Sequence, residues 1–258
     1  MEKQPHINDK FILESYGLTD VGCVRKSNED AWGQTNDSRF FSLADGMGGR
    51  KAGDIAAKQT ISTVCSCIEK DKEMVEKVSL PFVCDCLNKA IQRANRTVYN
   101  MSKSNEQFLG MGCTICCLYF HKDHLIYGHV GDSRIYLLRN QQLKLLTQDD
   151  SLIAELLEVG VVSEEEAKTF PLRHVLTKCI GTSPLVDPTV NALTFQADDL
   201  FILCSDGLTN ALSHEIIEKF LNQNYSLEQI ANNLVEAAKQ RGGYDNITVI
   251  LLRVLKDE

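Results

Sequence analysis

The chain has 258 residues, of which 43% are hydrophobic and 24% are charged, and its formal net charge is −8. This composition allows a sizeable core, and with five prolines and no Ser/Gly-rich tract nothing looks like a linker. We therefore expect a single domain over residues 1–258. The negative charge argues against a general nucleic-acid-binding protein, which is usually basic.

Secretion and membrane insertion are not indicated either. Residues 1–6 lack the apolar core of a signal peptide, and no apolar run approaches the roughly 18 residues that a membrane helix needs. The ten cysteines do not form the paired Cys-x2-Cys knuckles in loops that a zinc ribbon requires. We expect a cytoplasmic protein with free thiols, and no feature of the sequence demands more than a monomer.

In chain order, short apolar runs predict the first strands and spacings of three and four predict the first helices. A turn-rich segment with two adjacent acids separates the first strand from the next ones. Pro81 suits the first turn of its helix. The expected strands are 11–18, a short one at Trp32 and 40–44, and the expected helices are 51–68 and 81–101.

After Gly112 the apolar period becomes that of strands. Segments 113–120, 125–130 and 135–138 are separated by short polar turns, which predicts an antiparallel meander. An acidic helical segment over 151–177, with a capping box at Ser163, is expected to form a mobile flap. The remaining elements are predicted as strands 192–195, 200–204 and 247–252, and as helices 214–221 and 226–242.

The order of these elements predicts the fold class. The helices come in two pairs, with antiparallel strands before, between and after them, and the regular strand–helix alternation of a doubly wound fold is missing. Because both faces of a sheet must be covered, we expect an α/β (α+β) protein. Its architecture would be a four-layer α-β-β-α sandwich with two central, mainly antiparallel sheets.

Acidic residues recur where expected strands begin or end, beside glycine or asparagine. Each one alone is more often a turn residue than a ligand. Several acids at strand ends of one sandwich can converge, and clustered carboxylates repel one another unless a cation compensates. Oxygen ligands favour Mg²⁺ or Mn²⁺ over Zn²⁺, and two such ions about 3.5–4 Å apart activate water. The acids are Asp45, Asp132, Asp206 and Asp245, with Glu29-Asp30 as a fifth acidic spot.

Arg25 lies five residues before Asp30 in the turn-rich segment. Its planar guanidinium suits phosphate oxygens, although a solvated surface arginine is an equally plain interpretation. Together with an activated water, it points to hydrolysis of a phosphate ester.

Five short motifs resemble those of one family when they are taken in order and spacing. The motifs are Arg25-x-x-Asn28-Glu29-Asp30, Ala44-Asp45-Gly46-Met47-Gly48-Gly49, Gly131-Asp132-Ser133-Arg134, Ser205-Asp206-Gly207-Leu208 and Asp245-Asn246-Ile247-Thr248. With these motifs the chain is similar, over about residues 11–254, to the metal-dependent protein serine/threonine phosphatases of the PP2C (PPM) family, in its short bacterial form.

The resemblance implies a role for each matching residue. Asp45 would bridge two Mn²⁺ or Mg²⁺ ions, and the Gly46 carbonyl would complete one of them. Asp206 and Asp245 would hold the other ion. The remaining implied roles are water-mediated metal binding by Glu29 and Asp30, phosphate binding by Arg25, a third metal at Asp132 with Asp206, and substrate contact by the flap.

Two positions depart from the family pattern. Met47 stands where eukaryotic members have a histidine proposed as general acid, so the leaving-group proton must come from a water or another group, or contribute little. Asp149-Asp150-Ser151 stands where the family often has Asp-His-Ser, which implies altered anchoring of the flap.

The resemblance predicts hydrolysis of phosphoserine and phosphothreonine in proteins, opposing a Ser/Thr kinase that would be the partner. Two alternatives remain open. One is a sporulation-type phosphatase that acts on a small regulatory protein. The other is a pseudophosphatase, a binding module with little turnover, although the full set of Asp45, Asp206 and Asp245 speaks against it.

Overall fold

The computed structural model describes residues 6–8, 10–47 and 52–257. Gly48, Gly49 and the expected helix start at Lys51 lie outside the described residues. The helices are α1 (Gly53–Val75), α2 (Leu80–Ser104), α3 (Leu152–Glu158), α4 (Glu164–Thr169), α5 (Asp206–Thr209), α6 (His214–Leu221) and α7 (Leu227–Gln240), with a 3-10 turn at Glu106–Phe108.

The strands form two large antiparallel sheets and one small one. The six-stranded sheet has the order β1 (His6–Asn8), β2 (Phe11–Asp20), β13 (Ile247–Lys256), β12 (Leu200–Cys204), β9 (Arg134–Arg139) and β10 (Gln142–Leu145). The five-stranded sheet has the order β11 (Thr189–Thr194), β8 (His124–Val130), β7 (Ile115–His121), β4 (Phe40–Ala44) and β3 (Ala31–Gln34). The small sheet pairs β5 (Gly46–Met47) with β6 (Gly112–Cys113).

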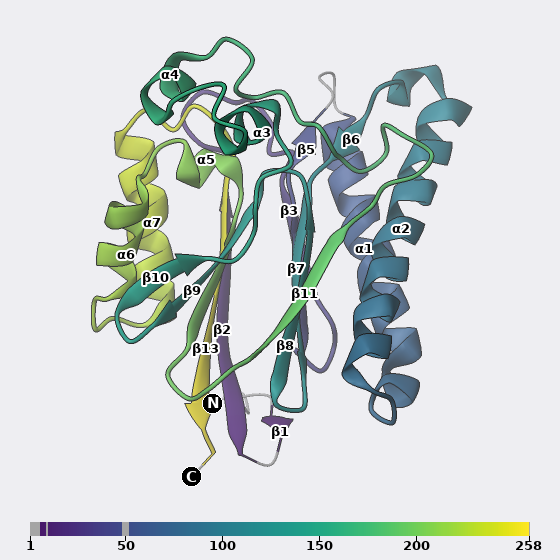
Figure 1. The fold of residues 1–258 in the computed structure, drawn as a ribbon, viewed down its shortest axis with the longest axis vertical. Helices are drawn as coiled ribbons and strands as arrows, with labels where there is room; N and C mark the ends of the chain where they lie inside the picture. The colour runs from purple at the N-terminus through teal and green to yellow at the C-terminus, as the bar shows by residue number, and fades with distance from the viewer. Residues whose placement is uncertain (1–5, 9, 48–51, 258) are drawn as a thin grey trace.

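Three apolar clusters hold the layers together, which confirms the predicted α-β-β-α sandwich. One cluster joins α1 and α2 to the five-stranded sheet, and a second joins α6 and α7 to the six-stranded sheet. The third lies between the sheets, where Phe41, Phe120 and Phe201 are fully buried. Figure 1 shows the two helix pairs on the outer faces of the two sheets.

The helices follow from their sequences, with shifted ends. Pro81 lies in the first turn of α2, as expected, and the capping boxes of α4 and α7 are both formed. α1 runs past the predicted end at residue 68 because Val75 continues its buried stripe. All ten cysteines fall in the described residues and are unpaired thiols. Among the helices that the structure describes, none is both long and apolar enough to span a membrane.

The predicted meander is wrong in its third strand. β7 and β8 pair as expected, but β9 leaves their sheet and pairs with β12 and β10 in the other one. The turn between β8 and β9 therefore crosses from one sheet to the other at one end of the sandwich. Gly131 lies in this turn with a φ of +105°. A positive φ of this kind favours glycine, so the residue type suits the turn.

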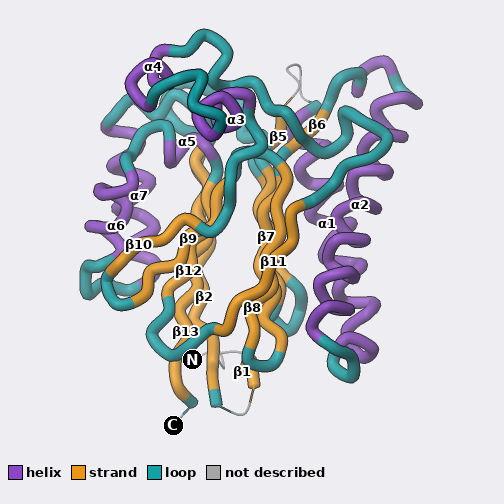
Figure 2. Tube along the Cα trace, viewed as in Figure 1, coloured by secondary structure: helices purple, strands orange, loops and turns teal. Residues whose placement is uncertain are grey.

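The segment over 151–177 lies over the same end of the molecule. It contains α3 and α4, and Figure 2 shows these two helices and their loops above the ends of the strands, close to α5. The expected strand at 192–195 is observed as β11, shifted toward the N-terminus, and strand 200–204 is observed as predicted. Strands β1 and β10 and the short helix α5 were not predicted.

Candidate metal centre

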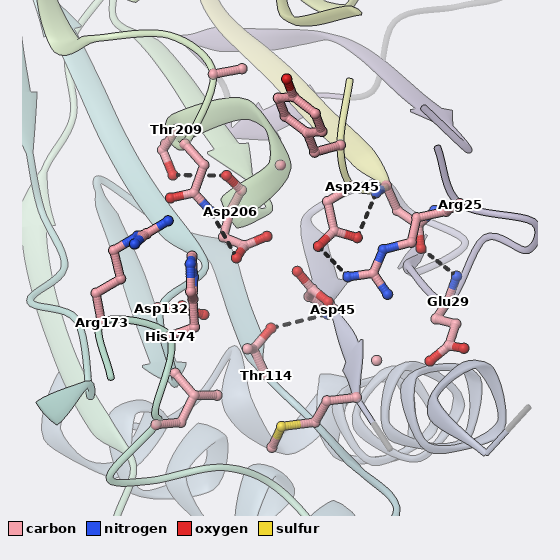
Figure 3. A pocket seen from close by; sticks show the side chains of 18 of the residues that line it. Arg25, Glu29, Asp45, Thr114, Asp132, Arg173, His174, Asp206, Thr209 and Asp245 are labelled. Carbon is pink, nitrogen blue, oxygen red and sulfur yellow. Dashed lines mark hydrogen bonds and ion pairs between the residues drawn. The ribbon is translucent and has the colours of Figure 1, made fainter. Parts of the chain in front are cut away.

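A cavity of about 980 Å³ opens at the end of the sandwich where the sheet-crossing turn and the 151–177 segment lie. Its acids come from the ends of different strands, so that residues up to 220 positions apart in the sequence line the same cavity (Figure 3). Asp45 follows β4, and Asp132 lies between β8 and β9. Asp206 follows β12, and Asp245 precedes β13. The predicted side chains Arg25, Glu29, Asp45, Asp132, Asp206 and Asp245 all line the cavity, together with Gly46.

Asp45 is held by its backbone. Its N–H donates to Thr114 Oγ1 at 3.0 Å, and its carbonyl accepts from the Thr114 N–H at 2.8 Å. Thr114 Oγ1 also lies 2.7 Å from Ser133 Oγ, next to Asp132. Two acids that are far apart in sequence are thus fixed relative to each other through the buried hydroxyl of Thr114.

Gly46 lies where a side chain does not fit. A Cβ at this position would lie 2.3 Å from the Gly53 carbonyl oxygen and 2.6 Å from that of Glu29. The glycine therefore lets the chain pass between the start of α1 and the segment that carries Glu29.

Asp206 and Asp245 are brought together by the close contact of two turns. Asp206 opens α5, and a Cβ on Gly207 would lie 2.0 Å from the Asn246 carbonyl oxygen. Asp206 Oδ2 accepts from Asn210 at 3.0 Å, whereas Oδ1 is buried without a hydrogen-bond partner among the described residues. Asp245 Oδ2 accepts from Arg25 at 2.7 Å.

Glu29 lines the cavity, whereas Asp30 is buried and is not among the residues that line it. Asp30 accepts hydrogen bonds from Ser205 at 2.8 Å and Thr248 at 2.6 Å, and its Oδ1 is buried without a partner among the described residues. The Glu29 N–H donates to Asn246 Oδ1 at 2.8 Å. Both acids therefore stand beside the turn that carries Asp245.

Burial and the charges of neighbouring acids raise the pKa values of the carboxyl groups in and beside the cavity. Desolvation raises the pKa of Asp45 well above its usual value, and the charges of Asp30 and Asp206 raise it further. Desolvation, followed by the charge of Asp206, raises the pKa of Asp132 to about 7.

The acids nearest to Asp245 show the same effect. Burial raises the pKa of Asp30 to about 6, although the Thr248 and Ser205 hydrogen bonds oppose the rise. Desolvation and then the charge of Asp245 raise the pKa of Asp206, and burial raises that of Glu29. Such a set of acids binds protons or a compensating cation.

The donor set fits hard divalent ions. Carboxylate and carbonyl oxygens are the ligands that Mg²⁺ and Mn²⁺ prefer, and the unpartnered Oδ1 atoms of Asp30 and Asp206 are unused donors. Within the described residues, no three His, Cys, Asp or Glu side chains already stand as ligands around one point. In this arrangement Asp245 is paired with Arg25.

Several residues of the cavity were missed by the sequence reasoning. Thr114 belongs to an apolar strand run, and nothing in the sequence marks it as a neighbour of Asp45. Arg173 and His174 reach the cavity from the 151–177 segment, on the side of Asp132 (Figure 3). A protonated His174 would oppose the rise in the pKa of Asp206 that desolvation and the charge of Asp245 cause. An adjacent basic pair inside an acidic segment was the available signal for these two residues.

Comparison with known proteins places this geometry in a family. The sequence profile of protein phosphatase 2C matches residues 24–246. The serine/threonine phosphatase stp of Listeria welshimeri is 35% identical over 237 residues, which cover 91% of this chain and 93% of stp.

Solved structures agree with the sequence comparison. The serine/threonine phosphatase of S. agalactiae has a TM-score of 0.86 and 36% identity, covering 93% of this chain and 99% of that one. The catalytic domain of the phosphatase PstP, in complex with two manganese ions, has a TM-score of 0.83 and 31% identity, covering 95% and 99%. The chain therefore belongs to the protein phosphatase 2C family of protein serine/threonine phosphatases.

Proposed function

We propose that the chain uses a pair of Mn²⁺ or Mg²⁺ ions to hydrolyse phosphoserine and phosphothreonine in proteins. The observation that carries this proposal is the cluster of oxygen donors with raised pKa values and unused oxygens at one end of the sandwich. The manganese pair in the similar PstP structure supports it. Asp45, the Gly46 carbonyl, Asp206 and Asp245 would hold the ions, with Glu29 and Asp30 acting through water and Asp132 serving a third ion.

A pair of divalent ions held by these residues would make a water nucleophilic near neutral pH. The residues of the chain do the rest. Arg25 is placed to bind the phosphate, because 54% of its side chain is exposed and its planar guanidinium matches phosphate oxygens. Met47 lines the cavity but carries no proton to donate, so the residue after Asp45-Gly46 does not protonate the leaving group.

Asp206→Ala tests the proposal directly. Because this change removes a ligand, we expect kcat/KM for a phosphothreonine peptide with Mn²⁺ to fall by at least about a hundredfold, which corresponds to nearly 3 kcal/mol of transition-state stabilisation. Asp85→Ala is the matched control, since Asp85 is a half-exposed acid on α2, away from the cavity. Wild-type protein that stays inactive with Mn²⁺ at every pH tested would instead support the binding-module alternative.

We also propose that residues 1–258 form one domain that acts as a cytoplasmic monomer, with a Ser/Thr kinase and its phosphorylated substrates as partners. The ten unpaired thiols support a reducing compartment. The kinase partner follows from the reaction, because a phosphatase of this class consumes what a Ser/Thr kinase produces. Light scattering on the purified chain tests the monomer, and a dimer mass would contradict it.

A further inference from the structure

The two ends of the 151–177 segment are tied together at Asp150. The Asp150 carbonyl accepts from the Thr177 N–H at 2.9 Å, and the Leu152 N–H donates to the Val175 carbonyl at 2.8 Å. Ser151 and Leu176 form an isolated β-bridge between these two hydrogen bonds. The segment that carries Arg173 and His174 into the cavity therefore enters and leaves through one short antiparallel ladder.

Asp150 also forms two hydrogen bonds with Gly131, the residue before Asp132. Its N–H donates to the Gly131 carbonyl at 3.0 Å, and its Oδ2 accepts from the Gly131 N–H at 3.0 Å. Both peptide groups that flank Gly131 are thus fixed by one residue. A Cβ on Gly131 would lie 2.7–2.8 Å from the Thr114 side chain, so the turn is also packed tightly on its other side.

The Asp150 carboxylate is itself held in place. Its Oδ1 lies 3.0 Å from Lys178 Nζ, and 11% of the Asp150 side chain is exposed against 40% of Lys178. The neighbouring Asp149 forms a bidentate ion pair with Arg134, with N–O distances of 2.7–3.2 Å. Because a nearly buried carboxylate without a partner is unfavourable, the ion pair with Lys178 holds the Asp150 carboxylate where it accepts from the Gly131 N–H.

We infer that Asp150, oriented by Lys178, is a positioning residue that fixes the Asp132 turn and joins it to both ends of the 151–177 segment. Asp150 acts through Asp132 and does not itself touch an ion or the substrate. The inference rests on the proposed function in that Asp132 is taken to bind the weakest of three ions. This positioning role gives a function to Asp150, which stands where the family often has histidine.

The test is a Mn²⁺ titration of the full chain, with free Mn²⁺ read by electron paramagnetic resonance. Asp150→Ala is expected to weaken the weakest ion at least tenfold and to leave the two tighter ions within twofold. Lys178→Met should weaken the same ion about threefold, and Lys178→Arg should restore it. Lys89→Met is the matched control, because it removes a Lys–Asp pair of 2.6 Å on the surface of α2, and it should change nothing.

Asp132→Ala separates failure of this inference from failure of the proposed third site. If Asp132→Ala loses the weakest ion while Asp150→Ala keeps it within twofold, the positioning role is overturned and the role of Asp132 stands. If Asp132→Ala binds that ion as wild type does, both assignments fall.

A metal-free measurement covers the case in which Asp150→Ala does not fold. Hydrogen exchange of the Gly131 amide should be faster in Lys178→Met than in Lys89→Met, because the acceptor of that amide is less well held. Equal rates would overturn the orienting role of Lys178.

Discussion

Arg25, the expected phosphate-binding residue, forms an ion pair with Asp245, an expected metal ligand. The distance from Arg25 Nη2 to Asp245 Oδ2 is 2.7 Å. More than half of the arginine side chain is exposed, and an ion pair of this kind contributes only about 0–1 kcal/mol. The guanidinium can therefore exchange this carboxylate for a phosphate without a large loss of stability. This exchange predicts that Arg25 binds the substrate phosphate and does not activate the attacking water.

Arg25→Ala is accordingly expected to raise KM for a phosphothreonine peptide by about 10–100-fold, the worth of one charge-assisted hydrogen bond of about 1.5–3 kcal/mol. kcat should change by less than about threefold, because uniform binding affects KM alone. Steady-state kinetics with saturating Mn²⁺ measures both, and Arg25→Lys should recover part of the loss. A variant with an unchanged KM would remove Arg25 from this role.

Thr114 gives a second prediction at this scale. Thr114→Val keeps the volume but removes the buried hydroxyl that accepts from the Asp45 N–H and meets Ser133. Leaving such a donor unpaired costs about 1–3 kcal/mol, so urea unfolding should show a loss of this size. Thr114→Ser keeps the hydroxyl and should lose less; the hydrogen-bond account fails if serine is the worse of the two.

At the scale of elements, the apolar period predicted most helices and strands but not which strands pair. Segment 135–138 has the pattern of a buried strand, and that pattern is the same in either sheet. The choice depends on Gly131 and on long-range pairing with β12, which local sequence does not encode. Ser205-Asp206-Gly207 looks like a turn, so the short helix α5 was hidden. The acids could be predicted as site residues because each stands beside glycine or asparagine at a strand end. Thr114 could not be predicted, because it lies within an apolar run.

The sheet-crossing turn predicts a large effect for Gly131→Ala. A left-handed conformation costs a non-glycine residue about 1–2 kcal/mol, and the clash with Thr114 adds about 1–3 kcal/mol of overpacking. Gly110→Ala is the control, since Gly110 has a φ of +77° and nothing within 4 Å of the added Cβ. Urea unfolding should show a clearly larger loss for Gly131→Ala. Equal losses would mean that Thr114 yields to the new methyl group.

For the whole molecule, the gathered acids make stability depend on pH and on ions. The pKa of Asp132 in the folded chain is raised to about 7 from 3.8, so without ions the folded state binds more protons than the unfolded state between these values. The free energy of unfolding contributed by this group therefore falls as the pH rises through about 4 to 7. Bound cations reverse this sign, because they require the ionised form.

Asp132→Asn isolates this contribution. In chelator, the melting temperature of the variant should equal that of wild type near pH 4 and exceed it increasingly up to pH 8, because the amide mimics the protonated acid. Scanning calorimetry at several pH values measures the difference. A difference that shrinks as the pH rises would show that Asp132 is stabilised as a carboxylate in the ion-free protein.

The central claim is that acids from distant parts of the chain hold two hard divalent ions at one end of the sandwich. A crystal structure with Mn²⁺, in which the ions are located by their anomalous scattering, tests it most directly. We expect two strong peaks in the cavity, with the Asp45 carboxylate between them, the Gly46 carbonyl on one ion, and Asp206 and Asp245 on the other. A cavity without peaks at saturating Mn²⁺, or ions bound away from Asp45, would contradict the account.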